Sequence, residues 1–236
     1  MLIAGLLLVT VGDATPRSDD LEAVPPIYGA AVATLGPTPG TSVATYLTNA
    51  SFKLRHFGEV GASKPTFAVV DLASFQSPAQ VQEVFRAIEV VRVYVKVHAG
   101  NLPTLVRGVP LTSITELDTG LSTAATVARS TAKSYGVLLH GLHPRTTADR
   151  TVKFRYAQQR RAALREAAVL SAPRNCGCVF AVIVRGTFLQ LSAIARDGFV
   201  RAVDPAPAEV QLSGLTVLPL LPDVTRLVPR TGLPGG

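Results

Sequence analysis

With 236 residues, the chain is long enough for one large domain or two small ones. Its 47% hydrophobic and 17% charged residues exclude an intrinsically disordered chain and indicate a globular protein. The net charge of +7 is carried mostly by arginine, since only five of the 23 basic residues are lysine. This balance permits phospholipid headgroups, wall polymers or nucleic acid as partners without selecting among them.

The chain begins with an apolar segment at residues 2–11, shorter than the roughly 20 residues of a membrane-spanning helix. No basic residue precedes it, although Gly12 and Ala14 are small residues of the kind that a signal peptidase reads. Three interpretations fit: a signal or anchor helix truncated by a late start codon, a complete but unusual signal, or the buried first element of a soluble protein. The polar, proline-bearing residues 13–26 are typical of a juxtamembrane linker and favour the first. We therefore assign residues 1–26 to an N-terminal segment and its linker.

Residues 67–97 have the pattern of a strand, a helix and a second strand. The apolar run at 67–70 is typical of a strand buried on both faces. Ser77 and Pro78 are the residue types of an N-cap and a first helical position. Apolar and polar residues then alternate over 91–97, which predicts a half-buried edge strand. These residues form the first predicted βαβ unit.

Residues 99–178 are too long for a simple connection between two such units. Alternating apolar positions in 105–117 predict an additional edge strand. Two helical patterns follow, the second with Thr147 or Asp149 as its N-cap. Because a short turn joins them, they predict an antiparallel helical hairpin over 119–172.

A second βαβ pattern occupies residues 176–207. The unbroken apolar run at 179–184 predicts a buried strand, and Thr187 is a suitable N-cap for the short amphipathic helix after it. A short strand then ends at Asp204 and Pro205. The Phe-Ala-Val sequence that occurs in the first strand of both units indicates an internal repeat.

Two such halves resemble the ferredoxin-like β-α-β-β-α-β sandwich, whose first and third strands are central. We predict an α+β domain at 27–207 with the hairpin 119–172 inserted between the halves. Two unrelated βαβ units in a larger α/β sheet are the alternative. The proline- and glycine-rich residues 208–236 form a C-terminal strap and tail.

A ferredoxin-like sheet carries helices on one face only, so its second face needs another cover. The hairpin's alanine-rich stripe is sufficient to pair its own helices but narrow for covering a sheet. We therefore expect the strap to cover the second face and the hairpin to project as an interaction element.

Cys176 and Cys178 are separated by one glycine at the start of a central strand. Three interpretations fit: a disulfide formed in an oxidising compartment, a pair of buried thiols, or a redox or metal site. A metal site needs about four ligands, and the four histidines of the chain form no matching cluster in the sequence.

No arrangement of residues predicts a catalytic, cofactor or metal site. His140 and His143 are half of a metal site at most, and we expect them to be surface histidines of a turn. Asp71 is unusual because it lies in an apolar central strand, where an unpaired carboxylate is costly. If the two central strands are parallel neighbours, Arg185 is its expected partner.

The helix over 150–165 carries a basic cluster that is the strongest candidate for a contact with an anionic partner. A solvated helix face is the alternative interpretation, and we expect Phe154 and Tyr156 to pack rather than to stack on bases. No nucleic-acid-binding motif accompanies the cluster. Its members are Lys153, Arg155, Arg160, Arg161 and Arg165.

The arginine-rich composition, the short leading apolar segment and the Arg-Ala-Val-Asp-Pro sequence at 201–205 resemble uncharacterised membrane-associated proteins of high-G+C Gram-positive bacteria. We expect a non-enzymatic, membrane-anchored extracytoplasmic protein that contacts a protein or an anionic envelope surface and uses no cofactor or small-molecule substrate. The alternative is a cytoplasmic nucleic-acid-binding protein that uses the arginine-rich helix 150–165.

Overall fold

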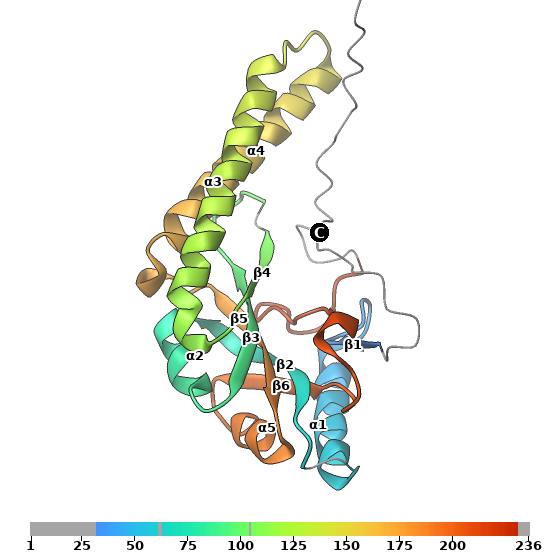
Figure 1. Cartoon of the computed structure of the whole chain (residues 1–236). Coiled ribbons are helices and arrows are strands. Elements are labelled where there is room, and N and C mark those ends of the chain that lie inside the picture. The colour runs from blue at the N-terminus through green and yellow to red at the C-terminus, as the bar shows by residue number, and fades with distance from the viewer. Residues whose placement is uncertain (1–31, 61–62, 104, 231–236) are drawn as a thin grey trace, which may run out of the picture.

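A five-stranded antiparallel sheet lies at the centre of the computed structural model, which describes residues 32–60, 63–103 and 105–230 (Figure 1). Its spatial order is β4-β3-β5-β2-β6. The strands are β2 Thr66–Gln76, β3 Glu89–Lys96, β4 Val106–Pro110, β5 Val179–Gly186 and β6 Val200–Pro205. The predicted α+β composition is confirmed, whereas residues 1–26 lie outside the described residues.

Two strand–helix–strand units supply four of these strands. Helix α2 (Pro78–Phe85) connects β2 to β3, and α5 (Phe188–Ile194) connects β5 to β6. Ser77 and Thr187 cap these helices as predicted, each in a capping box with the glutamine three residues later. The same local signal therefore starts the helix of each unit.

Strands β2 and β5 pair in the middle of the sheet, with Val70 opposite Val182. Val69, Val70 and Val182 are fully buried, because side chains of a central strand alternate between two covered faces. Strand β3 was expected at an edge, but β4 pairs along it from Arg92 to Lys96. The edge strands are therefore β4 and β6.

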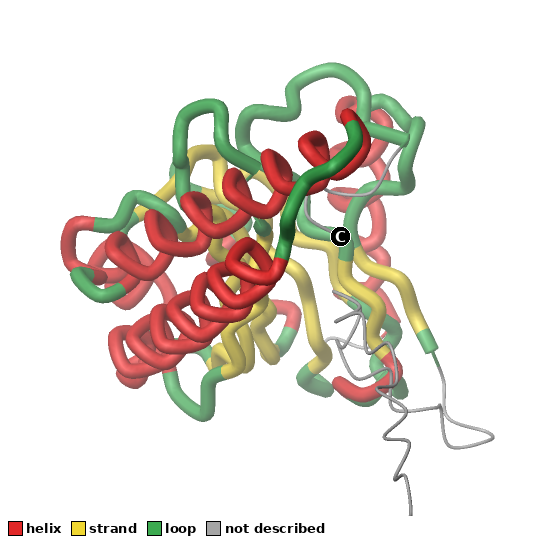
Figure 2. The backbone as a smooth tube through the Cα atoms, turned by 90° about the horizontal axis from the view of Figure 1, so that it is seen from above, coloured by secondary structure: helices red, strands yellow, loops and turns green. Residues whose placement is uncertain are grey.

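Helices cover one face of the sheet. Phe85 of α2 and Leu191 of α5 are fully buried there against the sheet valines. Helix α1 (Val43–Val60) packs along β6 and contributes Leu54 and Phe57 to the same core. Figure 2 shows these helices and the hairpin around the strands.

The C-terminal residues 206–230 cover the opposite face. Val210 and Leu221 pack there against Val69 and Ile183. A two-stranded parallel sheet of β1 (Ala33–Leu35) and β7 (Leu215–Val217) adds to this cover. Short 3-10 helices lie at Ile114–Glu116, Pro173–Asn175 and Leu212–Gly214.

Helices α3 (Leu117–Gly141) and α4 (Thr147–Leu170) form the hairpin, whose free end extends well beyond the sheet (Figure 1). Its other end is part of the core, because Leu117, Leu121 and Leu170 are fully buried with the sheet valines. The expectation that the hairpin's apolar stripe serves only its own helices is therefore wrong for this end. The base of the hairpin packs on the sheet, and the upper part projects.

Candidate anionic-partner surface

All five residues of the predicted basic cluster are exposed on α4. Lys153 and Arg160, seven residues apart, share one side of the helix, and Arg161 and Arg165, four apart, share the adjacent side. Arg155 faces a different direction. Among the described residues, none of the five forms an ion pair with an acidic side chain.

The acidic residues of α4 are engaged elsewhere. Asp149 accepts hydrogen bonds from the backbone N–H groups of Arg145 and Thr146, at 2.9 and 2.8 Å, which lower the pKa of its carboxyl group. The N-cap is Thr146, one residue before the predicted Thr147, and Asp149 closes its capping box. The buried Glu166 pairs with Arg107 of β4 at 2.7 Å. Neither acidic residue of α4 therefore forms an ion pair with a member of the basic cluster.

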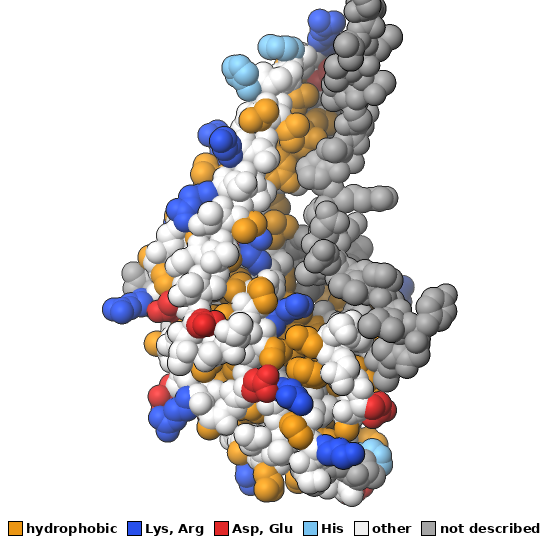
Figure 3. Space-filling view, in the orientation of Figure 1, with side chains coloured by type: hydrophobic (Ala, Val, Ile, Leu, Met, Phe, Trp, Pro, Cys, Tyr) orange, Lys and Arg blue, Asp and Glu red, His pale blue; other side chains and the backbone are white. Residues whose placement is uncertain are grey.

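The hairpin concentrates the charge of the whole protein. Residues 117–170 contain nine Lys or Arg and three Asp or Glu, a net charge of +6, while the complete chain has +7. Figure 3 shows basic side chains along the outer edge of the hairpin and histidine side chains near its free end. The remainder of the protein is thus almost neutral.

A groove on the hairpin brings in residues that the sequence analysis missed. It has a volume of about 470 Å³ and is lined by Arg160 of α4 and by Lys133, Gly136, Val137 and His140 of α3. The spacing of Lys133, Val137 and His140, which is i, i+4 and i+7, was the available signal that they share a face. A single sequence does not tell which face of α3 adjoins Arg160.

Exposed apolar side chains accompany the basic ones. Val137 is 67% exposed, Phe154 64% and Leu164 46%. The expectation that Phe154 packs is therefore wrong, whereas Tyr156 lies against Tyr135 with ring centroids 5.8 Å apart. Isolated exposed apolar residues are common on proteins, but here they lie among cations on a projecting element.

The two histidines of the hairpin lie at its free end. His140 lies in the last turn of α3 and His143 in the turn that follows, and both are exposed. Within residues 32–60, 63–103 and 105–230, no group of three or more His, Cys, Asp or Glu could hold a metal ion.

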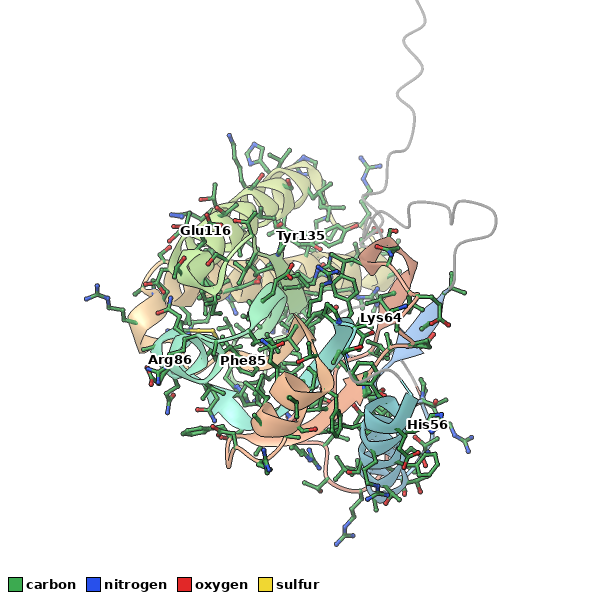
Figure 4. All side chains as sticks on the ribbon, turned by 60° about the horizontal axis from the view of Figure 1, so that its bottom comes forward. His56, Lys64, Phe85, Arg86, Glu116 and Tyr135 are labelled. Carbon is green, nitrogen blue, oxygen red and sulfur yellow. A yellow bond between two sulfur atoms is a disulfide. The ribbon has the colours of Figure 1, made fainter. Side chains whose placement is uncertain are left out.

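Cys176 and Cys178 lie just before β5, both buried, with their sulfur atoms joined across Gly177. Figure 4 draws this bond in yellow. The Cys178 carbonyl oxygen accepts a hydrogen bond of 2.9 Å from the Lys96 N–H, which fixes the segment on β3. We assign these cysteines a structural role next to the sheet, away from the exposed part of the hairpin.

Asp71 and Asp204 form a buried acidic pair under the C-terminal segment. Asp71 accepts hydrogen bonds from the Tyr46 hydroxyl at 2.6 Å and from the Leu220 N–H at 2.8 Å. Burial raises the pKa of Asp71 to about 7 and also raises the pKa of Tyr46. The predicted pairing with Arg185 is wrong, because β2 and β5 run antiparallel and Arg185 lies opposite Phe67.

Asp204 anchors two other segments to the sheet. Its carboxylate accepts 2.8 Å hydrogen bonds from Lys53 Nζ of α1 and from the N–H of Gly36. Gly36 has a φ of +94°, and a Cβ there would collide with the Leu218 carbonyl oxygen. These contacts attach α1, the turn after β1 and the C-terminal segment to the sheet, so we interpret the acidic pair as structural.

A second cavity, of about 220 Å³, lies between the hairpin and the residues after β3. Val97, Leu105 and Ala163 supply apolar lining, and Tyr135 and Gln159 supply polar groups. The Gln159 Oε1 atom is buried without a hydrogen-bond partner among the described residues. The cavity is small and does not include the exposed cations.

No family model, curated protein or solved structure matches the chain. Among the described residues, no helix is long and apolar enough to span a membrane.

Proposed function

We propose that the protein is a non-enzymatic, membrane-anchored extracytoplasmic module that contacts a protein or an anionic envelope surface through its helical hairpin. The observation that carries this proposal is the net charge of +6 on residues 117–170 of a chain whose total is +7. The basic cluster of α4 is exposed, and the acidic residues of that helix are engaged in the capping box and in the pair with Arg107. A projecting, uncompensated cationic surface attracts anionic partners and speeds their association.

We also infer that the two βαβ units form a ferredoxin-like scaffold. The spatial order of their four strands is β3-β5-β2-β6, with the first strand of each unit in the middle. All neighbouring strands of this sheet are antiparallel, which favours a ferredoxin-like arrangement over a larger α/β sheet of parallel strands. In this scaffold the hairpin is an insertion that leaves the order of the two units intact.

Envelope binding by two charge-matched variants tests the proposed function. The first changes the basic cluster Lys153, Arg155, Arg160, Arg161 and Arg165 to Gln. The second, the control, changes five exposed basic residues outside the hairpin to Gln, namely Arg55, Lys64, Arg86, Arg174 and Arg196. We expect the cluster variant to bind isolated cell envelopes at least about tenfold more weakly and the control to bind normally. Equal losses in both variants would contradict a specific role of the hairpin.

A cytoplasmic nucleic-acid-binding protein is the second candidate. The exposed Phe154 ring favours it, because bases stack on aromatic side chains that lie among cations. The same two variants discriminate the candidates when they are titrated with duplex DNA and single-stranded RNA. Cluster-dependent binding of nucleic acid, without cluster-dependent binding of envelopes, would select this alternative.

A further inference from the structure

Both helices of the hairpin contribute side chains to the groove at Gly136 and to the helix sides next to it. On α3, Lys133, Val137 and His140 follow the spacing i, i+4 and i+7, so they lie on one side of that helix. On α4, Lys153, Arg160 and Leu164 follow i, i+7 and i+11 and also share one side. We call these six residues the hairpin face.

The two halves of the hairpin face meet at Gly136. A Cβ atom at this position would lie 3.5 Å from Arg160 Nε, so the guanidinium group of α4 extends across the surface of α3 where α3 has no side chain. The groove of about 470 Å³ described above contains Lys133, His140 and Arg160 at this crossing. Cations from two helices therefore surround one shallow depression.

The hairpin face alternates cations with exposed aliphatic side chains. Val137 is next to Lys133 and His140, and Leu164 is one turn from Arg160. Lys153 and Arg160 are separated by about 10 Å along the helix axis, from a rise of about 1.5 Å per residue. All four of Lys133, Val137, Arg160 and Leu164 are exposed.

We propose that the hairpin face docks on an anionic phospholipid surface, with the cations at the level of the phosphates and Val137 and Leu164 inserted among the headgroups. This inference rests on the proposed function and names the partner of that surface. Lys and Arg side chains suit such an interface because their apolar stems lie along apolar surroundings while their charged ends reach the phosphates. Anionic lipid attracts basic residues that lie within a Debye length of the membrane.

The composition of this face favours lipid over nucleic acid. It has no aromatic side chain on which a base could stack, since Phe154 lies on the adjacent side of α4. Its exposed apolar residues, Val137 and Leu164, are aliphatic and lie within one helical turn of Lys133 and Arg160. The hairpin projects from the sheet, so a flat surface can reach this face (Figure 1).

Vesicle binding by the full chain tests the inference. The vesicles are phosphatidylcholine alone, or phosphatidylcholine with about a third of phosphatidylglycerol. The variant K133Q/K153Q/R160Q removes three cations of the face, and R55Q/K64Q/R196Q removes three exposed cations elsewhere. In Figure 4, His56, the neighbour of Arg55 on α1, lies at the opposite end of the molecule from the hairpin.

The measured quantity is the gain in affinity that phosphatidylglycerol produces, so any binding by residues 1–31 to neutral lipid cancels. We expect the face variant to lose about ten- to hundredfold of this gain and the control to lose less than about twofold. A gain that stays intact in the face variant would overturn the inference. If the basic-cluster variant still binds isolated cell envelopes more weakly than its five-residue control in that case, the proposed function stands and only the lipid partner is wrong.

Insertion is tested separately with a fluorescent reporter. The chain contains no tryptophan, so Val137→Trp introduces a single one on the face, and Phe52→Trp introduces one at an exposed position of α1 as the control. We expect a blue shift of emission on anionic vesicles for Val137→Trp only. An unshifted spectrum for Val137→Trp, or face-dependent binding to oligonucleotides in place of vesicles, would overturn the inference.

Discussion

The Tyr46 hydroxyl and the Asp71 carboxylate are joined by a buried hydrogen bond of 2.6 Å across 25 residues of chain. This bond ties α1 to the central strand β2, and the second oxygen of Asp71 holds the C-terminal segment through the Leu220 N–H. Burial of Asp71 raises its pKa to about 7, although the hydrogen bonds donated by Tyr46 and by the Leu220 N–H stabilise the carboxylate and lower that pKa.

The first prediction concerns pH. The folded protein keeps a proton on Asp71 up to a pKa of about 7, whereas the unfolded chain loses it near 3.8. The contribution of this group to stability is therefore fully present below about pH 4 and is lost as the pH rises to about 7. Its slope is at most about 1.4 kcal/mol per pH unit.

Urea unfolding at about pH 5 and about pH 7 measures this effect. Asp71→Asn keeps the acceptor for Leu220 and removes the titration, so the fall in stability between the two pH values should be smaller in the variant. The same fall in both proteins would show that Asp71 does not titrate in this range.

The second prediction concerns the pairing of Asp204. Lys53→Ala removes the ammonium group 2.8 Å from a carboxylate that is fully buried. The Lys53 side chain is 48% exposed and solvent weakens its attraction, so we expect a loss of about 1–2 kcal/mol in the free energy of unfolding. Lys64→Ala, at an exposed lysine, should change it by less than about 0.5 kcal/mol, and an equal effect of both changes would contradict the pairing.

Some of these arrangements were predictable from local sequence, and others were not. The caps Ser77 and Thr187 and the buried strands around Val69 and Val182 follow from short patterns, because one turn or one strand determines them. The partner of Asp71 depends on strand direction and on a hydroxyl from another helix, so no local pattern contained it. The set of residues in the hairpin face was also not predictable from the sequence, because it depends on how α3 and α4 are rotated against each other.

The third prediction concerns the base of the hairpin. Leu121→Ala and Leu170→Ala each leave a cavity in the core, and each should lower the free energy of unfolding by about 2–5 kcal/mol. Val137→Ala, on the projecting part of α3, should lower it by less than about 0.5 kcal/mol. Small effects at all three positions would mean that the hairpin does not pack on the sheet.

The fourth prediction concerns the cysteines. In freshly isolated protein unfolded under non-reducing conditions, Cys176 and Cys178 should resist alkylation until a reductant is added, because their sulfur atoms are joined. Mass spectrometry counts the alkylated thiols before and after reduction. Two thiols that react without reductant would contradict both the disulfide and an oxidising location.

The most direct measurement of the hairpin's role is the salt dependence of binding to isolated cell envelopes. Salt screens exposed charges, with a Debye length that falls from about 30 Å at 0.01 M to about 3 Å at 1 M. The control is the variant that changes Arg55, Lys64, Arg86, Arg174 and Arg196 to Gln. For the unmodified protein and this control, we predict affinities that fall together as the salt concentration rises. For the variant that replaces the basic cluster Lys153, Arg155, Arg160, Arg161 and Arg165, we predict a weak affinity that salt changes little. If the three proteins follow the same salt curve, the hairpin is not the surface that contacts the envelope.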